Sequence, residues 1–251
     1  MIYEVGAEQT LHFRQVFWAA ELLGWAKREQ FFHIPHGLIR LKEGKISTRK
    51  GNAVKLEQVL SEAIDRAKKF NDDSEISKMV GIGAVKYNDL KHSPATGYVF
   101  DWAEMINLDG NSGPYLQYTY ARCCSVLQRS GITNYQLPIT NYSPNSEELA
   151  ILRFIYRFPE VVQTAATQYS PNLVCTFLYE LAQRFNTFYN KHRILENNDQ
   201  RTENNEQRAK TNEQKTKNKE LTRFRLLLTS AVSQILKNGL TLLGIQTPEK
   251  M

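Results

Sequence analysis

The sequence predicts a mainly α-helical protein in which a short α/β portion is followed by an all-α helical bundle. Short strand-like runs occur near the start of the chain, whereas apolar residues in its second half recur at the three- and four-residue spacing of amphipathic helices. The turn-rich segment 107–115 separates the two regions, because its two glycines and its proline interrupt any continuous element. We therefore expect two domains, at 1–113 and 114–251.

The first domain begins with alternating short elements. A strand-like run ends at Gly6, and a helix is expected at about 9–23. The next apolar run, 31–41, is interrupted by a proline and a glycine. We expect a bend at this point, followed by a short buried strand at 38–41.

Helices are expected throughout the rest of the chain. Segment 56–67 carries one apolar stripe, and a second helix is expected at 75–90. Further helices are expected at 115–128, at 147–158 with a break or kink at Pro159, around the apolar stripe 174–188, and at 221–243. Several long amphipathic helices in succession favour a helical bundle.

A polar tract interrupts the second domain at 197–220. It consists almost entirely of Asn, Gln, Thr, Lys, Arg and Glu and has no apolar stripe. Such a segment buries too little surface to offset its ordering entropy. We interpret it as a low-complexity insertion that forms either a flexible loop or a solvated helical extension.

Composition limits the class of protein and its environment. The chain has 251 residues and a formal charge of +6, which permits a polyanionic partner such as nucleic acid without requiring one. No apolar run approaches the length of about 18 residues that a bilayer span requires, and no signal peptide is visible. The three cysteines lack metal-type spacing, which favours reduced thiols in a cytoplasmic protein and predicts no structural metal.

A basic loop, GKISTRKGN at 44–52, is the strongest local indication of function. It combines three cations with two hydroxyls between flanking glycines, which allow close backbone approach to a ligand. It also lies between an expected strand and an amphipathic helix, where α/β proteins commonly bind nucleotide phosphates. An ordinary solvated surface loop is the alternative, and the Walker A pattern is absent.

The second domain offers a candidate nucleic-acid surface. Tyr115, Tyr118 and Arg122 share one face of the helix expected at 115–128. Aromatic rings beside an arginine suit stacking on unpaired bases together with phosphate contact. A partly buried aromatic stripe is the alternative interpretation.

The basic loop resembles the KMSKS signature of class I aminoacyl-tRNA synthetases, and its longer string resembles the form found in arginyl-tRNA synthetases. Four other segments resemble that family in the same order: VGAEQTLHFRQVF, AVKYNDLKHSP, FDWAEMINLDGNSGPYLQYTYAR and GLTLLGIQTPEKM. The resemblance covers essentially the whole chain except 197–220. It implies the C-terminal remnant of a Rossmann-like α/β catalytic domain followed by a DALR-type anticodon-binding bundle. The implied reaction joins L-arginine to tRNA(Arg) with ATP, accompanied by Mg²⁺, and releases AMP and pyrophosphate.

The resemblance assigns catalytic roles to Lys45, Ser47, Arg49 and Lys50. Amino-acid activation displaces pyrophosphate at the α-phosphate, so it needs positioning and cations on the accumulating negative charge. The second lysine of the wider signature falls at Thr48 here, which leaves open which cation contributes most.

The resemblance also assigns residues to substrate binding. Gln9 would recognise the arginine side chain through its amide oxygen, and His12 would line the nucleotide pocket. His36 and Gly37 belong to a segment that would pass under the adenine. Their string, HIPHG, superficially resembles the HIGH motif of the class, but it stands too close to the basic loop. A metal site at this histidine pair lacks further ligands at suitable spacing.

By the same resemblance, the Tyr115, Tyr118 and Arg122 face holds the anticodon loop, and Tyr189 and Met251 complete it. The HIGH motif and the first half of the nucleotide-binding fold are absent from the sequence. We therefore expect a C-terminal fragment that binds tRNA(Arg) but is inactive alone, with the N-terminal catalytic half as a possible missing partner and no membrane association. A stand-alone tRNA-binding module and a basic helical scaffold are the alternatives.

Overall fold

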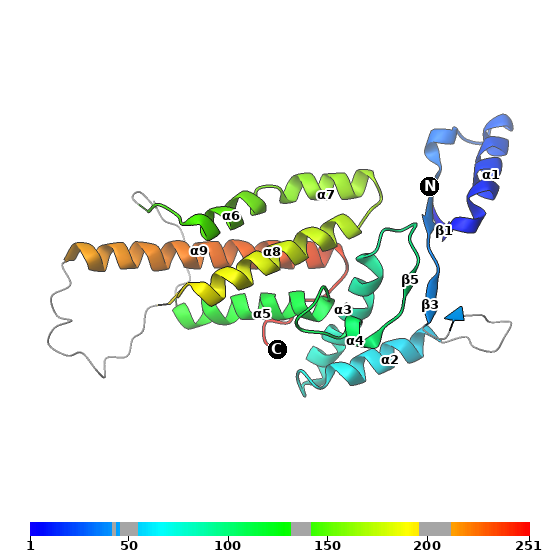
Figure 1. Cartoon of the computed structure of the whole chain (residues 1–251). Coiled ribbons are helices and arrows are strands. Elements are labelled where there is room, and N and C mark those ends of the chain that lie inside the picture. Colours follow the sequence, from blue (N-terminus) through cyan, green and yellow to red (C-terminus); the bar gives the residue numbers. More distant parts are fainter. Residues whose placement is uncertain (42–43, 46–54, 132–141, 196–211) are drawn as a thin grey trace.

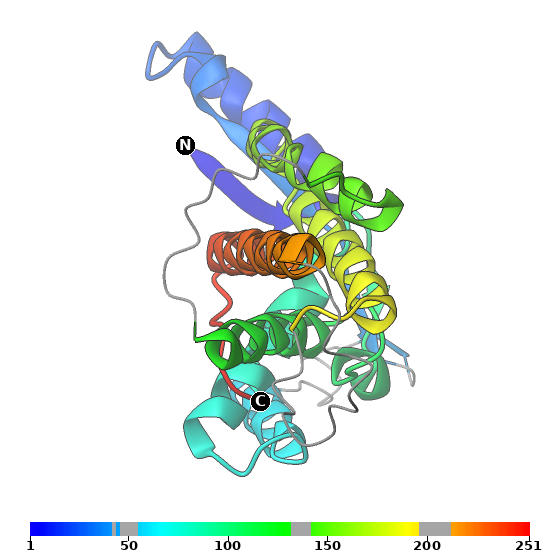
Figure 2. The same ribbon diagram turned by 90° about the vertical axis from the view of Figure 1, so that its left-hand side faces the viewer.

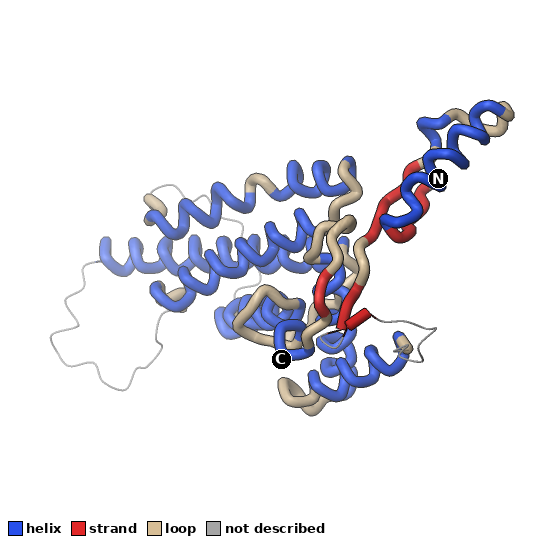
Figure 3. The backbone as a smooth tube through the Cα atoms, turned by 45° about the vertical axis from the view of Figure 1, so that its right-hand side comes forward, coloured by secondary structure: helices blue, strands red, loops and turns tan. Residues whose placement is uncertain are grey.

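The computed structural model describes residues 1–41, 44–45, 55–131, 142–195 and 212–251. Within them, an N-terminal lobe (residues 1–36) projects from one end of a body made largely of helices (Figure 1). The body comprises a small sheet with a helix pair and a longer helical bundle. The tube in Figure 3 shows that strands form the narrow connection between the lobe and the body.

The lobe is a β-α-β unit with two parallel strands. β1 (Ile2–Gly6) pairs along its whole length with β2 (Phe32–His36), and α1 (Thr10–Leu22) lies between them in the chain. Short 3-10 turns, η1 (Ala7–Gln9) and η2 (Arg28–Gln30), connect these elements. The expected helix is confirmed, but the bend expected in 31–41 is wrong at 32–36, which is a strand. A proline is compatible with this strand because β2 is an edge strand among the described residues.

The second sheet has the order β4-β3-β5. β3 (Ile39–Leu41) pairs antiparallel with β4 (Gly44–Lys45) and parallel with β5 (Tyr98–Val99), which the sequence analysis missed. The expectation of a buried strand at 38–41 is wrong, because Leu38 and Ile39 are each 39% exposed. A strand is buried only where another layer covers its face, and apolar composition alone does not reveal that layer.

Two long helices follow the basic loop. α2 (Leu56–Ala67) and α3 (Ser74–Leu90) agree with the helices expected at 56–67 and 75–90, and they pack against each other. Asp73 caps α3, because its carboxylate accepts hydrogen bonds from the backbone N–H groups of Glu75 (2.9 Å) and Ile76 (3.2 Å). The pair is close-packed at Gly81, where a Cβ would lie 2.7 Å from the backbone of Ile64. The short helix α4 (Trp102–Met105) completes this part and was not predicted.

The bundle contains the main hydrophobic core. Its helices are α5 (Gly113–Ser130), α6 (Ser146–Ile155), α7 (Phe158–Thr167), α8 (Asn172–Lys191) and α9 (Asn212–Leu242). Figure 2 looks along α9 and shows α5 and α8 running beside it. Fully buried apolar side chains from these helices, including Leu116, Phe185 and Leu236, fill the space between them.

Two helices have bounds that differ markedly from expectation. The helix predicted at 147–158 ends at Ile155, and a second helix, α7, begins at Phe158. Pro159 lies in the first turn of α7 and not at a kink, and its missing N–H has no helical partner to lose there. α9 begins at Asn212 instead of 221, so the end of the polar tract is helical; the part of the tract at 197–211 lies outside the described residues. The proposed domain boundary at 113/114 falls in the first turn of α5.

Candidate functional sites

The first candidate site lies at the carboxyl ends of β1 and β2. Both strands end at this edge, because Gly6 is in register with His36. Gln9 and His12 follow β1 at the start of α1 and are exposed, so both side chains are available to a ligand. The structure thus brings Gln9, His12 and His36 to one edge, where parallel α/β sheets bind ligands.

His36 and Gly37 have structural roles of their own. The Nδ1 atom of His36 lies 3.2 Å from the Gly37 carbonyl oxygen. The Gly37 N–H donates to the Pro94 carbonyl at 2.7 Å, and a Cβ on Gly37 would lie 2.2 Å from the Gly97 nitrogen. Close contact between two backbone segments therefore explains this glycine without any ligand.

His33, the other histidine of HIPHG, packs inside the lobe. Its ring stacks on Phe13 with centroids 4.7 Å apart, and its Nε2 lies 3.1 Å from the carbonyl oxygen of Val5. Across the described residues, no group of three or more His, Cys, Asp or Glu side chains is arranged to hold a metal ion.

The basic loop lies mostly outside the described residues. Ser47, Arg49 and Lys50 belong to that part, and so does Thr48. Lys45 is described as the last residue of β4, where it pairs with Arg40 of β3. β3 itself follows β2 in the chain after residues 37–38.

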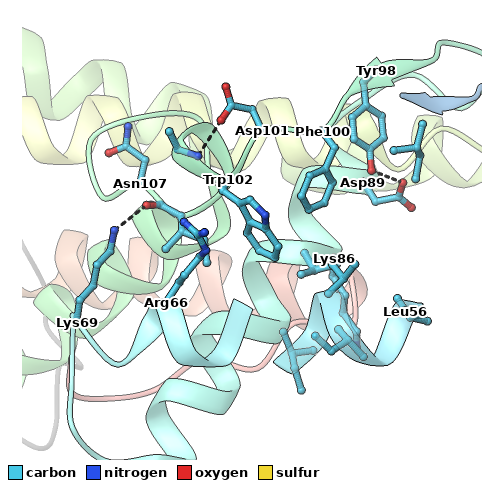
Figure 4. Close-up of a pocket in the computed structure, with 17 residues that line it drawn as sticks. Leu56, Arg66, Lys69, Lys86, Asp89, Tyr98, Phe100, Asp101, Trp102 and Asn107 are labelled. Atoms are coloured by element: carbon cyan, nitrogen blue, oxygen red, sulfur yellow. Dashed lines mark hydrogen bonds between the residues drawn. The ribbon is translucent and has the colours of Figure 1, made fainter. Parts of the chain in front are cut away.

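A cleft of about 1230 Å³ lies beside the base of this loop (Figure 4). Ile39, which precedes the loop, and Leu56, which follows it, both line the cleft. Arg66 and Trp102 also line the cleft, and the Arg66 guanidinium lies 4.9 Å from the centre of the Trp102 ring. Sequence analysis missed this cleft, because its walls come from segments far apart in the chain.

The cleft has a polar rim at β5. The Tyr98 hydroxyl donates a hydrogen bond to Asp89 at 3.1 Å, drawn dashed in Figure 4. Burial, followed by the negative charge of Asp89, raises the pKa of Tyr98 well above its ordinary value. The hydroxyl is therefore a fixed hydrogen-bond donor at neutral pH and not a proton carrier.

The second candidate site joins α5 to α8. The Arg122 guanidinium lies 4.8 Å from the centre of the Tyr118 ring and 4.9 Å from that of Tyr189. Its Nη1 donates to Asn186 Oδ1 at 2.7 Å. The arginine is thus held between two half-buried rings from different helices, which is a preorganised cationic surface.

Asn186 connects this cluster to Tyr115. Its Nδ2 donates to the hydroxyl oxygens of Tyr115 and Thr119, each at 3.0 Å. Burial raises the pKa of Tyr115, and the hydrogen bond from Asn186 partly offsets this effect. Sequence analysis missed Asn186, although its position three residues before Tyr189 places both on one face of α8.

The C-terminal tail reaches α5 at a different face. Gln117 Nε2 donates to the carbonyl oxygen of Gln246 at 2.7 Å. Tyr120 borders the tail near Thr247, and burial is the first cause that raises its pKa, to about 12. Gln117 and Tyr120 lie on the side of the helix opposite Tyr118, and Met251 is half-buried beyond this stretch. That Met251 acts together with Tyr115, Tyr118, Arg122 and Tyr189 at the anticodon surface stays a prediction.

These two parts define a class of protein, one in which a parallel α/β unit is followed by an all-helical domain. Residues 1–102 match the family described as tRNA synthetases class I (R), catalytic domain, and residues 116–251 match the DALR anticodon binding domain. The chain belongs to the arginyl-tRNA synthetase family of class I.

Individual relatives agree with this assignment. The chain is 38% identical to an arginine–tRNA ligase of Halothermothrix orenii and 36% identical to one of Clostridioides difficile, covering all of this chain and 42% of each relative. Its fold is similar to that of Thermus thermophilus arginyl-tRNA synthetase, with a TM-score of 0.80, 28% identity, and coverage of 100% of this chain and 41% of that one. The chain thus spans less than half the length of these relatives.

Proposed function

We propose that this chain supplies the anticodon-binding domain and the end of the catalytic domain of an arginine–tRNA ligase. The boundary between them is placed at 113/114, which agrees with family matches that end at 102 and begin at 116. The full activity joins L-arginine to tRNA(Arg) with ATP and Mg²⁺. The three unpaired cysteines agree with a cytoplasmic setting.

The observation that carries the proposal is the position of Arg122 between two tyrosines. A guanidinium fixed by Asn186 presents its remaining N–H groups without a large loss of side-chain entropy. The exposed portions of the rings offer stacking surface for unpaired bases. We propose that Tyr115, Tyr118, Arg122 and Tyr189 hold the anticodon loop, together with Met251.

Lys45, Ser47, Arg49 and Lys50 are proposed to contact the phosphates of ATP. β3 begins three residues after His36 in the chain, so the strand that leads into the loop follows closely on the edge that carries His36. Gln9 is proposed to bind the arginine substrate, with His12, His36 and Gly37 at the nucleotide. The nucleotide-binding role of Gly37 has the weakest support, because the close approach to Gly97 already explains why a glycine stands at this position.

The lobe supports the proposal that a further polypeptide segment completes the catalytic site. Trp18, Leu22 and Trp25 are 58%, 71% and 77% exposed, which is unusual for such large apolar side chains. A parallel sheet is normally covered on both faces, whereas β1 and β2 form a two-stranded sheet among the described residues. We therefore expect this chain alone to bind tRNA but not to catalyse ATP–pyrophosphate exchange.

Titration with tRNA(Arg) at several salt concentrations tests the tRNA surface. Arg122→Ala should weaken binding by about tenfold or more and reduce the salt slope by about one. Arg129→Ala is the matched control, because Arg129 is an exposed arginine on the same helix. Equal affinities for the two variants, with circular dichroism showing both folded, would refute the assignment.

A stand-alone tRNA-binding module without a catalytic role is the second candidate, favoured by the self-contained core of the bundle. Mixing this chain with the separately expressed N-terminal half of a relative distinguishes the two functions. The quantity measured is ATP–pyrophosphate exchange by the mixture. ATP–pyrophosphate exchange that appears on mixing, and that Lys45→Ala abolishes, supports the ligase. Unaltered tRNA binding with no exchange on mixing supports the module.

A further inference from the structure

Among the described residues, two well-separated contacts join the lobe to the body. Its strands and helix pack mainly on one another. At the end of β2, Gly37 makes its backbone contact with Pro94 and Gly97. At the start of β2, Phe32 packs against Tyr169 of the bundle, with ring centroids 5.4 Å apart. The two points are separated by about 16 Å, at about 3.3 Å per residue of strand.

Tyr169 has an unusual backbone conformation. It lies in the turn after α7 and has a φ of 51°, the one positive φ outside glycine in the described part of the chain. Its N–H donates to the Ala166 carbonyl, and the next N–H, of Ser170, donates to Ala165. This is the helix-ending position that glycine normally occupies, because a Cβ is disfavoured there.

A strained tyrosine in place of glycine needs a compensating contact. The ring contact with Phe32 is such a contact. It requires an aromatic side chain at position 169, which glycine lacks, and it joins the bundle to the lobe. Phe32 is 41% exposed, so the contact lies at the surface and leaves the core unaffected.

We propose that Tyr169 and Phe32 form a latch that fixes the angle of the lobe relative to the bundle. With the Gly37 contact as the second anchor in the described part of the chain, loss of the latch leaves the lobe free to pivot about that glycine. Tyr169 is thus a positioning residue for the lobe that carries Gln9, His12 and His36. The catalytic consequence rests on the proposed function, whereas the geometry of the latch does not.

Distance distributions between two spin labels test the latch in the full chain without tRNA or ATP. The labels are placed at Arg14→Cys on α1 and Gln163→Cys on α7, both exposed positions, in a Cys124→Ser background. Tyr169→Gly should broaden the distribution while keeping or raising the midpoint of thermal unfolding, because it removes the backbone strain. Tyr169→Phe should retain the narrow distribution.

Phe32→Ala provides an independent variant, because it alters the lobe and leaves the turn intact. It should broaden the distribution as Tyr169→Gly does, and combining the two should add nothing further. Tyr156→Ala, at an 87% exposed tyrosine of the bundle, should have no effect. An unchanged distribution in both Tyr169→Gly and Phe32→Ala, or additive broadening in the double variant, would overturn the proposal.

Discussion

A buried ion pair secures the end of α8 that carries Tyr189, and its removal gives a sharp test of the energetics. The Arg225 Nε donates to Glu148 Oε1 at 2.8 Å, and its Nη1 donates to the carbonyl oxygen of Arg193 at 2.7 Å. The Glu148 side chain has no exposure and that of Arg225 has 11%. The pair therefore joins α6 and α9 to the segment that follows α8, away from water.

Arg225→Met should destabilise the protein strongly. It leaves Glu148 Oε1 without its charged donor, while Tyr142 and the Asn145 N–H still donate to Oε2. Breaking one side of a buried ion pair typically costs about 3–5 kcal/mol. For a chain of this size, that loss corresponds to a fall of about 6–20 °C in the unfolding midpoint.

The pH dependence gives a second signature of the same pair. Burial alone would raise the pKa of Glu148, but hydrogen bonds from Tyr142, Asn145 and Arg225 together hold it below its ordinary value. A depressed carboxyl pKa adds stability above the unfolded pKa, and that stability is lost as the pH falls through the folded pKa. The difference in unfolding free energy between wild type and Arg225→Met should therefore become smaller below about pH 4.

Urea denaturation followed by circular dichroism at several pH values measures both effects. Arg223→Met is the matched control, because Arg223 is exposed on the same helix and should change stability by less than about 0.5 kcal/mol. The pair contributes little to stability if Arg225→Met lowers the unfolding free energy no more than the control does. The same conclusion follows if the difference in unfolding free energy between wild type and Arg225→Met does not depend on pH.

Substitutions at three further positions test local geometry. Gly37→Ala places a Cβ against the backbone of Gly97 and should accelerate amide exchange in β2 about tenfold, measured by mass spectrometry; unchanged exchange contradicts the close approach. Asp73→Ala removes the cap of α3 and should cost about 1 kcal/mol in urea denaturation, whereas Asp73→Asn should largely restore it. Gly81→Val should separate α2 from α3 and lower stability by about 1–3 kcal/mol, and a neutral result would mean that the two helices have room to shift.

Helical periodicity predicted much of the body correctly. The apolar stripe of 56–67 and the turn residues before Gly113 are local patterns, and both correspond closely to observed boundaries. The break between α6 and α7 was misplaced, because a proline suits the first turn of a new helix as well as a kink. Strand β5 was missed, because two residues carry too little pattern to be recognised before their partner β3 is known.

For the candidate sites too, local spacing predicted some features, whereas others depend on how the helices and strands pack. The common face of Tyr115, Tyr118 and Arg122 followed from their spacing on one helix. Their partner Asn186 could not be identified, because its distance from Arg122 depends on how α8 packs against α5. Likewise, nothing in the letters of HIPHG distinguishes His33, which stacks on Phe13, from His36, which lies at the open edge of the lobe.

The sequence by itself determined the order of the α/β portion and the bundle, the basic loop, and the family, because these depend on local composition and on motifs in a fixed order. The tertiary structure alone decided which aromatic rings enclose Arg122, that Gly37 faces a second backbone segment, and that Tyr169 accepts a left-handed conformation beside Phe32. Each of these is a contact between segments far apart in the chain. Such contacts form only after the helices and strands have packed, so no local pattern encodes them.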